Sequence, residues 1–298
     1  MNIASTPTPF GSAPGDGRLP DATRVGGVHL QVSDLPRSIA YYRDVIGLRV
    51  IEVSADAAML GVPESAEPLV TLHAVPGTRP TRRRGAFGLF HFAVLLPDRE
   101  ALGRFAAHVA SIGIHVGMSD HRVSEAFYLS DPDGLGIEVY ADRPRSTWRR
   151  IDGQLVMTTD PLDLDDLIQA AGGHAWDGVP ARTTMGHVHL HVGDLDQAAA
   201  FYQRGVGFHI TVWNYPGALF FSAGGYHHHL GTNVWAPGPA PTADQARLLE
   251  WTLVVPSAGE ARATGQRLQN TAGPIVEAGP DWLVTDPWGT RLHVSPER

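Results

Sequence analysis

An internal repeat constrains the fold of this chain more than any other feature of its sequence. Shifting the 298-residue sequence by 160 positions aligns VGGVHLQVSDLPRSIAYYRDVIGL, from Val25, with MGHVHLHVGDLDQAAAFYQRGVGF, from Met185, without a gap. Ten of these 24 aligned positions are identical. Because a repeated segment is expected to fold the same way twice, the chain should be built from copies of one small unit.

Each copy has the pattern of a strand followed by a helix. About six residues alternate between apolar and polar, and an Asp-Leu pair then opens an amphipathic stretch that ends at glycine. A second, weaker pair of segments starts at Phe90 and Glu250, and these segments lead to Asp-Pro-x-Gly, a tight turn between two strands. We therefore predict four units, starting near residues 25, 88, 185 and 248, each with one strand, a helix and about three more strands.

Composition limits the ligands and partners to be expected. The chain has no Cys, so a transition metal would have to be held by His and carboxylate side chains. A net charge of −8 and the lack of a long basic stretch argue against nucleic acid as a partner. No apolar run approaches the roughly 18 residues that span a bilayer, and no secretory signal is evident, so we expect a cytoplasmic protein that does not bind membranes. The basic cluster at residues 82–84 is expected to be a solvated loop.

With these repeats and turns, the sequence from residue 24 to 296 resembles the vicinal oxygen chelate superfamily and, more narrowly, the bacterial two-domain catechol 2,3-dioxygenases. The resemblance implies an α+β fold in which four βαβββ modules form two domains. We expect residues 1–22 to be a flexible tail, 23–146 the first domain, 147–182 a linker and 183–298 the second domain.

The resemblance also implies a set of metal ligands. In that superfamily, the first strand of a unit offers a ligand seven residues before the Asp that opens the helix. Counting back selects His91 in the second unit and His187 in the third, but in the first unit it selects Gly27, which has no side chain to ligate a metal. The last strand of a unit supplies a carboxylate after the Asp-Pro-x-Gly turn, and this is Glu138; the fourth unit has His293 there. The implied ligands are therefore His91, His187 and Glu138.

The second unit also reproduces the extradiol dioxygenase signature, in which a His and a Tyr precede the ligand Glu. The matching residues are His121, Phe127, Tyr128, Asp131, Pro132, Gly134 and Glu138. Only the first position departs from the pattern, where Ser119 replaces the usual Gly, Asn, Thr or aliphatic residue. The signature implies that His121 and Tyr128 contact the substrate and the oxygen-derived species.

Two histidines and one carboxylate on one face of iron(II) leave three adjacent positions open, two for a catecholate and one for O2. The resemblance thus implies iron(II), or manganese(II) as the alternative, with a small aromatic diol and O2 as substrates. A homo-oligomer is compatible with the sequence, which does not fix the oligomeric state.

A catalytic acid or base should lie near such a metal, because a proton leaves the catechol and later returns. The third unit carries three consecutive histidines, His227, His228 and His229, on its expected last strand. In a strand, His228 would face one way and its two neighbours the other. Comparison with the family favours His228 as the acid/base group.

The sequence leaves the pairing of the units open. Paired in chain order, units one and two offer His91 and Glu138, with only His29 as a displaced third ligand. Units three and four then offer another set, namely His187, Glu250 and His293. If units two and three pair instead, one metal is surrounded by His91, His187 and Glu138, with His121, Tyr128 and His228 nearby. We favour this second pairing because it gathers every residue that matches the family into one site.

Two other functions share this fold. A glyoxalase-type or thiol-transferring metalloenzyme would usually show a second Glu or Gln ligand. A non-enzymatic binding protein, such as a drug-sequestering resistance protein, would usually lack the ligand set. The sequence therefore favours a ring-cleaving extradiol dioxygenase.

Overall fold

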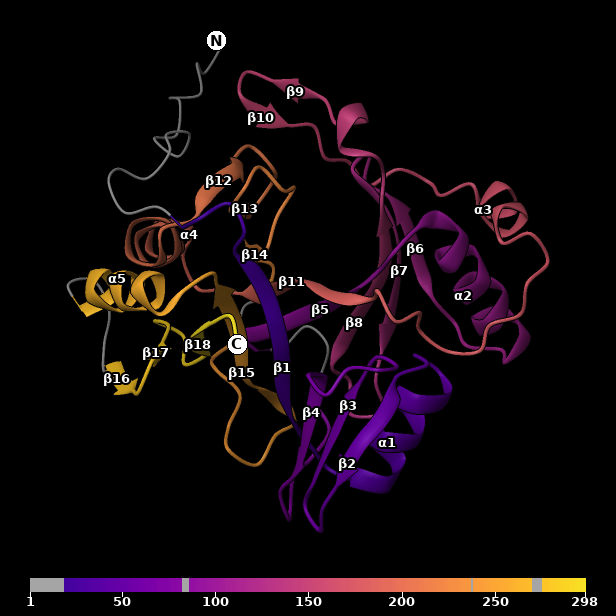
Figure 1. The fold of residues 1–298 in the computed structure, drawn as a ribbon, viewed down its shortest axis with the longest axis horizontal. Coiled ribbons are helices and arrows are strands. Elements are labelled where there is room, and N and C mark those ends of the chain that lie inside the picture. Colours follow the sequence, from indigo (N-terminus) through magenta and orange to yellow (C-terminus); the bar gives the residue numbers. More distant parts are fainter. Residues whose placement is uncertain (1–18, 82–85, 237, 270–274) are drawn as a thin grey trace.

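The computed structural model describes residues 19–81, 86–236, 238–269 and 275–298 (Figure 1). Most of the expected N-terminal tail and the basic cluster at residues 82–84 lie outside the described residues. Of the tail, residues 19–22 are described: the Leu19 side chain is buried and its backbone N–H donates to the carbonyl of Gly207. No helix in these described ranges is long and apolar enough to cross a membrane.

All four units have the order strand, helix, then three strands. The first unit comprises β1 (Arg24–Val32), α1 (Leu35–Asp44), β2 (Arg49–Val53), β3 (Ala57–Gly61) and β4 (Pro68–Ala74). The second comprises β5 (Gly88–Leu96), α2 (Arg99–Ser111), β6 (Gly117–Asp120), β7 (Ser124–Ser130) and β8 (Gly136–Asp142).

The third unit comprises β11 (Thr184–His191), α4 (Leu195–Ala198) continuing into the π-helical η2 (Ala199–Val206), β12 (His209–Val212), β13 (Ala218–Ser222) and β14 (Leu230–Asn233). The fourth comprises β15 (Arg247–Val255), α5 (Ala258–Gln269), β16 (Ile275–Ala278), β17 (Asp281–Thr285) and β18 (Arg291–Pro296). Between units two and three lie η1 (Arg145–Thr147), β9 (Arg150–Ile151), β10 (Gln154–Leu155) and α3 (Leu164–Ala170).

The repeated Asp residues act as helix N-caps. The side chain of Asp34 accepts from the backbone N–H of Arg37, and Asp194 accepts from that of Gln197. Such a bond satisfies one of the amide groups left unpaired at a helix start. The repeated glycine at the other end of each helix, Gly207 in the third unit, has a φ of 104°, which a residue with a side chain rarely adopts.

The units form two eight-stranded sheets (Figure 1). One sheet has the order β16-β17-β18-β15-β1-β4-β3-β2, and the other has the order β12-β13-β14-β11-β5-β8-β7-β6. Units one and four therefore share a sheet, and units two and three share the other, which is the pairing that the sequence argument favours. The predicted α+β fold of four βαβββ modules is confirmed.

Two tyrosine–aspartate hydrogen bonds connect the two sheets at equivalent positions. The hydroxyl of Tyr42, in unit one, donates to Asp131 Oδ2 in unit two at 3.1 Å. The hydroxyl of Tyr202, in unit three, donates to Asp286 Oδ2 in unit four at 2.7 Å. All four side chains are buried. The repeated Tyr and the Asp of the Asp-Pro-x-Gly turn are thus partners across the sheets.

Candidate metal centre

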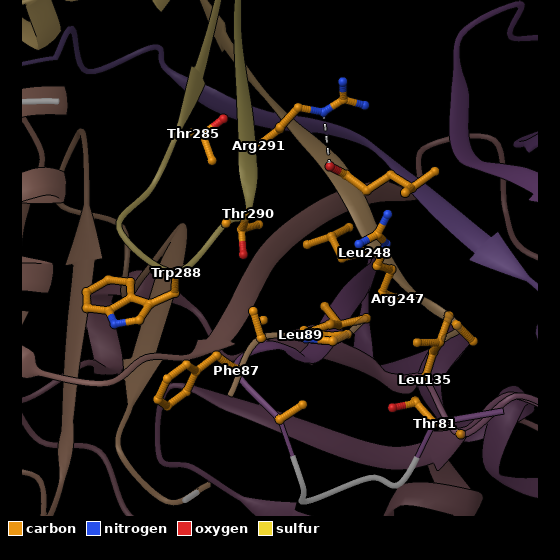
Figure 2. Close-up of a pocket in the computed structure, with 18 residues that line it drawn as sticks. Thr81, Phe87, Leu89, Leu135, Arg247, Leu248, Thr285, Trp288, Thr290 and Arg291 are labelled. Carbon is orange, nitrogen blue, oxygen red and sulfur yellow. Dashed lines mark hydrogen bonds between the residues drawn. The ribbon is translucent and has the colours of Figure 1, made fainter. Parts of the chain in front are cut away.

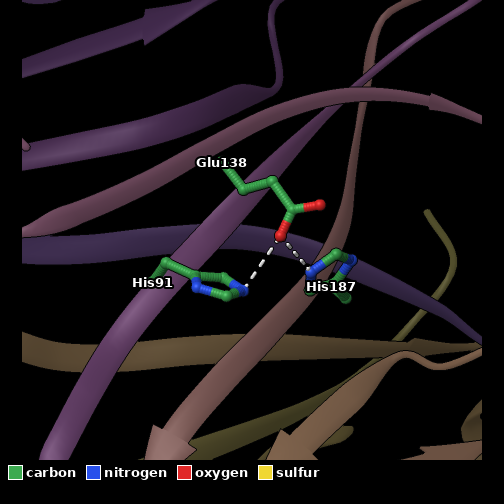
Figure 3. Close-up of side chains that lie close together, drawn as sticks. All are labelled: His91, Glu138 and His187. Carbon is green, nitrogen blue, oxygen red and sulfur yellow. Dashed lines mark hydrogen bonds and ion pairs between the residues drawn. The ribbon is translucent and has the colours of Figure 1, made fainter. Parts of the chain in front are cut away.

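Three side chains from adjacent strands converge on one point (Figure 3). His91 lies on β5, Glu138 on β8 and His187 on β11, and all three side chains are buried. Nε2 of His91 lies 3.0 Å from Oε2 of Glu138, and Nε2 of His187 lies 3.2 Å from the same oxygen. The three residues that the family spacing selects are therefore brought together.

The register of the sheet explains this convergence. Ala93 of β5 pairs with His187 of β11 on one side and with Glu138 of β8 on the other. Residues of one such row point to the same face of the sheet, and His91 shares that face because it precedes Ala93 by two positions. The side chain of Ala93 is a single methyl group, so it leaves space above the sheet between Glu138 and His187.

The donor atoms fit a divalent cation. Metal bonds of about 2.1 Å at right angles separate neighbouring donor atoms by about 3 Å, close to the two separations given above. Nε2 of His91 is buried and makes no hydrogen bond of good geometry, so its close contact with Oε2 of Glu138 leaves its lone pair for a metal. Within the described parts of the chain, this is the one group of three His, Asp or Glu residues whose donor atoms lie within 4.8 Å of one another.

The surroundings set the protonation states that metal binding requires. Burial lowers the pKa of His91 and of His187, and the neighbouring carboxylate only partly opposes this effect. Burial by itself would raise the pKa of Glu138, but the two imidazoles outweigh burial and hold that pKa well below its usual range. These directions favour the forms that bind a metal, an unprotonated imidazole nitrogen and an ionised carboxylate.

Tyr128 and His121 lie beside this group. Tyr128 pairs in register with Glu138, and its ring centroid lies 5.5 Å from that of His91. Its hydroxyl lies 2.5 Å from Nε2 of His121, while Nδ1 of His121 donates to the carbonyl of Thr158 at 2.5 Å. Burial, and then the charge of Glu138, raise the pKa of Tyr128 well above its usual value. Tyr128 therefore stays a protonated phenol that can donate a hydrogen bond.

The prediction that the three consecutive histidines lie on a strand is wrong. They precede β14, which starts at Leu230, because Gly224 and Gly225 form a turn with φ values of 59° and 67°. Strand alternation therefore does not apply to these residues, and the first two histidines of the run lie on the same side, near the metal ligands.

The ring centroids of His227 and His228 lie 6.0 and 4.1 Å from that of His187. His229 makes different contacts, since its Nδ1 accepts from the backbone N–H of Ala223 at 3.2 Å. Of the three histidines, His228 is thus the nearest to a candidate ligand.

Comparison with known proteins agrees with this geometry. The sequence profile of the Glyoxalase/Bleomycin resistance protein/Dioxygenase superfamily matches residues 24–139 and 184–294. The chain belongs to this superfamily. The vicinal oxygen chelate resemblance is thereby confirmed.

A relative supports the narrower resemblance. The catechol-2,3-dioxygenase of Bacillus subtilis (strain 168) is 43% identical over 270 residues, covering 89% of this chain and 94% of the relative. At this level of identity the predicted relationship to the catechol 2,3-dioxygenases, and with it the prediction of an enzyme, is confirmed.

Two solved structures share the fold. One is a protein from Bacillus subtilis subsp. subtilis str. 168, with a TM-score of 0.61, 13% identity and coverage of 92% of this chain and 86% of that chain. The other is glyoxalase I from Zea mays, with a TM-score of 0.54, 19% identity and coverage of 92% of both chains. At these identities the likeness concerns the fold alone.

The connection between units two and three also contributes to the surroundings of the site. This contribution was not predicted from the sequence. Residues 158–160 run beside the edge strand β6, where Asp160 and Asp120 exchange two backbone hydrogen bonds of 2.9 Å. The hydroxyl of Thr159 lies 2.8 Å from that of Tyr215, which lies between β12 and β13 at the opposite edge. The connection therefore links both edges of the sheet. No motif or periodicity in the sequence marks this role.

Three other candidate ligands considered in the sequence analysis, Glu250, His293 and His29, lie on the other sheet. Glu250 lies on β15 and His293 on β18, 3.6 Å apart between Oε1 and Nδ1, whereas His187 lies on β11. His29, on β1, contacts His73 across 3.2 Å. The structure does not bring Glu250 and His293 together with His187, nor His29 together with His91 and Glu138.

A pocket of ≈ 460 Å³ lies elsewhere (Figure 2). Residues around the start of β5, including Phe87 and Leu89, line it together with Arg247 of β15 and Trp288 of the turn before β18. None of the three candidate ligands lines this pocket. It is therefore distinct from the metal centre.

Proposed function

We propose that this protein is an extradiol dioxygenase that opens a catechol-type ring with O2, using a metal held by His91, Glu138 and His187. The observation that carries the proposal is the buried group of two histidines and one carboxylate, flanked by Tyr128 and His228. The identity to a catechol-2,3-dioxygenase over most of the chain supports the same reaction class.

When bound, iron(II), or alternatively manganese(II), would hold the two oxygens of a small aromatic diol and supply the redox chemistry that O2 requires. His91 and His187 bind as neutral imidazoles, and Glu138 contributes the one negative charge. Because these ligands come from three adjacent strands, they occupy one side of the centre and leave the other side to the substrates.

The neighbouring side chains move and hold protons. His228 lies close enough to His187 to take a proton from a hydroxyl of a substrate bound there, and to return it later. Tyr128 keeps its hydroxyl proton and donates it in a hydrogen bond to Nε2 of His121, so its hydroxyl oxygen can accept a hydrogen bond from a substrate hydroxyl. His121 accepts from that hydroxyl through Nε2 and keeps Tyr128 in place.

The test is anaerobic reconstitution with iron(II), followed by addition of O2 and a panel of catechols and hydroquinones. We expect O2 uptake and a yellow ring-opened product with at least one catechol. Glu250→Ala, on the other sheet, is a matched control that should keep this activity. If the iron-loaded protein consumes no O2 with any compound of the panel, the proposal is wrong, and a glyoxalase-type enzyme or a binding protein would be favoured.

A further inference from the structure

We infer that Asp142 and His227 are positioning residues that fix the tautomer of His228, so that Nε2 of His228 carries the free lone pair. Neither residue belongs to the implied ligand set or to the extradiol signature. The catalytic consequence rests on the proposed function, in which His228 is the acid/base group, but the tautomer itself does not.

A chain of three hydrogen-bonded side chains carries this inference. Oδ1 of Asp142 lies 2.9 Å from Nε2 of His227, and Nδ1 of His227 lies 2.7 Å from Nδ1 of His228. An ionised carboxylate only accepts, so Nε2 of His227 donates to Asp142. When His227 is neutral, its Nδ1 is therefore unprotonated. Since the contact between the two Nδ1 atoms requires one proton, His228 supplies it and keeps Nε2 unprotonated.

The surroundings hold this chain in place. The Tyr226 hydroxyl also donates to Asp142 Oδ1 at 3.1 Å and lies 2.6 Å from the Tyr140 hydroxyl. The guanidinium of Arg145 lies 5.2 Å from the centroid of the Tyr226 ring. His227 and His228 are buried, whereas the side chain of Asp142 is 27% exposed. The chain of contacts therefore extends from a partly exposed carboxylate to the histidine beside the metal ligands.

The chain of contacts depends on the pairing of units two and three. Asp142 ends β8 of unit two, and His227 lies in the turn before β14 of unit three. His228 packs against Phe220 and His187, with ring centroids 4.9 and 4.1 Å away. A ring held on these sides has little freedom to turn over, so the choice of tautomer decides which nitrogen can accept a proton from the substrate.

The first test is the 15N NMR spectrum of histidine-labelled protein loaded with zinc(II), which is diamagnetic. We expect His228 in the wild-type protein to be protonated at Nδ1 and unprotonated at Nε2. In Asp142→Ala this preference should weaken or reverse. A wild-type His228 protonated at Nε2 would overturn the inference, and so would an unchanged tautomer in Asp142→Ala.

The second test is the activity of the iron-loaded variants. Asp142→Ala should lower kcat by about 10- to 10³-fold with little change in KM or metal content, because a wrong tautomer removes the base without removing the site. Asp142→Asn should not recover this loss, because its amide NH2 can donate to Nε2 of His227 and favour the opposite tautomer. Full kcat in Asp142→Ala would contradict the positioning role.

Asp281→Ala is the matched control, since Asp281 lies 3.7 Å from His293 on the other sheet and should leave kcat unchanged. If wild-type protein shows no dioxygenase activity but His228 has the expected tautomer, the proposed function fails while the inferred tautomer stands. The two failures are therefore distinguishable.

Discussion

At the scale of single residues, the candidate metal centre depends on one small side chain and three large ones. Ala93 separates Glu138 and His187 in one row of the sheet, and His91 is two positions away on the same face. Glu138 interacts with both imidazoles through one oxygen, so it is the residue that the whole group shares. Its loss should therefore affect metal binding more than any other single change.

We expect Glu138→Ala to lose most of its bound metal, because two neutral imidazoles alone give neither the charge nor the third donor atom that the site provides. Metal analysis after reconstitution and desalting measures this. Glu250→Ala is the control and should retain its metal. The assignment would be wrong if Glu250→Ala lost its metal while Glu138→Ala kept it.

His228 should act differently from the ligands. His228→Gln is expected to keep its metal but to lower kcat by roughly 10²- to 10⁴-fold, the usual effect of removing a general acid or base. Steady-state kinetics with a catechol, alongside metal analysis, check this. A variant with normal kcat would show that another group, with His227 the nearest candidate, handles the proton.

At the scale of elements, the repeated Tyr and Asp connect modules that belong to different sheets. We expect Tyr42→Phe and Tyr202→Phe each to lower the free energy of unfolding by about 1–3 kcal/mol, because each leaves a buried carboxylate short of one donor. The effects should add in the double variant, since the two pairs share no partner. Urea unfolding measures all three. An unchanged free energy in both single variants would contradict this role.

Local patterns made much of each element predictable. The repeat, the Asp-Leu helix starts and the Asp-Pro-x-Gly turns predict the four βαβββ units, because each pattern acts within a few residues along the chain. The turn at Gly224 and Gly225 was missed, since two glycines can equally belong to a strand end, and the expected alternation of His227 to His229 failed with it.

Contacts between distant segments were harder to predict. The pairing of β5 with β11 depends on the fit of two buried faces, so the sequence could only favour it through the missing ligand at Gly27. The path of residues 158–160 past β6 rests on backbone hydrogen bonds and on side-chain contacts with residues far away in the sequence, such as that of His121 with the Thr158 carbonyl. Such contacts leave no readable signal in a single sequence.

At the scale of the whole molecule, a buried histidine outside the ligand group should make stability depend on pH. Burial lowers the pKa of His229 to about 3, below the usual value of 6.5 for a histidine. Between about pH 3 and pH 6.5, His229 is protonated in the unfolded chain but neutral in the folded protein. The stabilising contribution is therefore fully present above about pH 6.5 and is lost as the pH falls toward 3.

We expect the free energy of unfolding of wild-type protein to fall between pH 7 and pH 5 by about 2 kcal/mol more than that of His229→Asn. Asn is chosen because its side-chain oxygen can accept the Ala223 N–H in place of Nδ1. Urea unfolding of both proteins at the two pH values measures the difference. If the free energy of unfolding falls equally in the two proteins, His229 can be protonated in the folded state and the prediction is wrong.

The position of ring cleavage tests the proposed chemistry most directly. Oxygen-18 gas is supplied to the iron-loaded protein with catechol, and the product is analysed by mass spectrometry and visible absorbance. We expect a yellow semialdehyde that contains both atoms of one O2 molecule, apart from exchange at the aldehyde, because a substrate chelated through both oxygens favours attack beside the diol. Quantitative formation of the colourless dicarboxylic acid, cleaved between the two hydroxyls, would contradict the extradiol assignment.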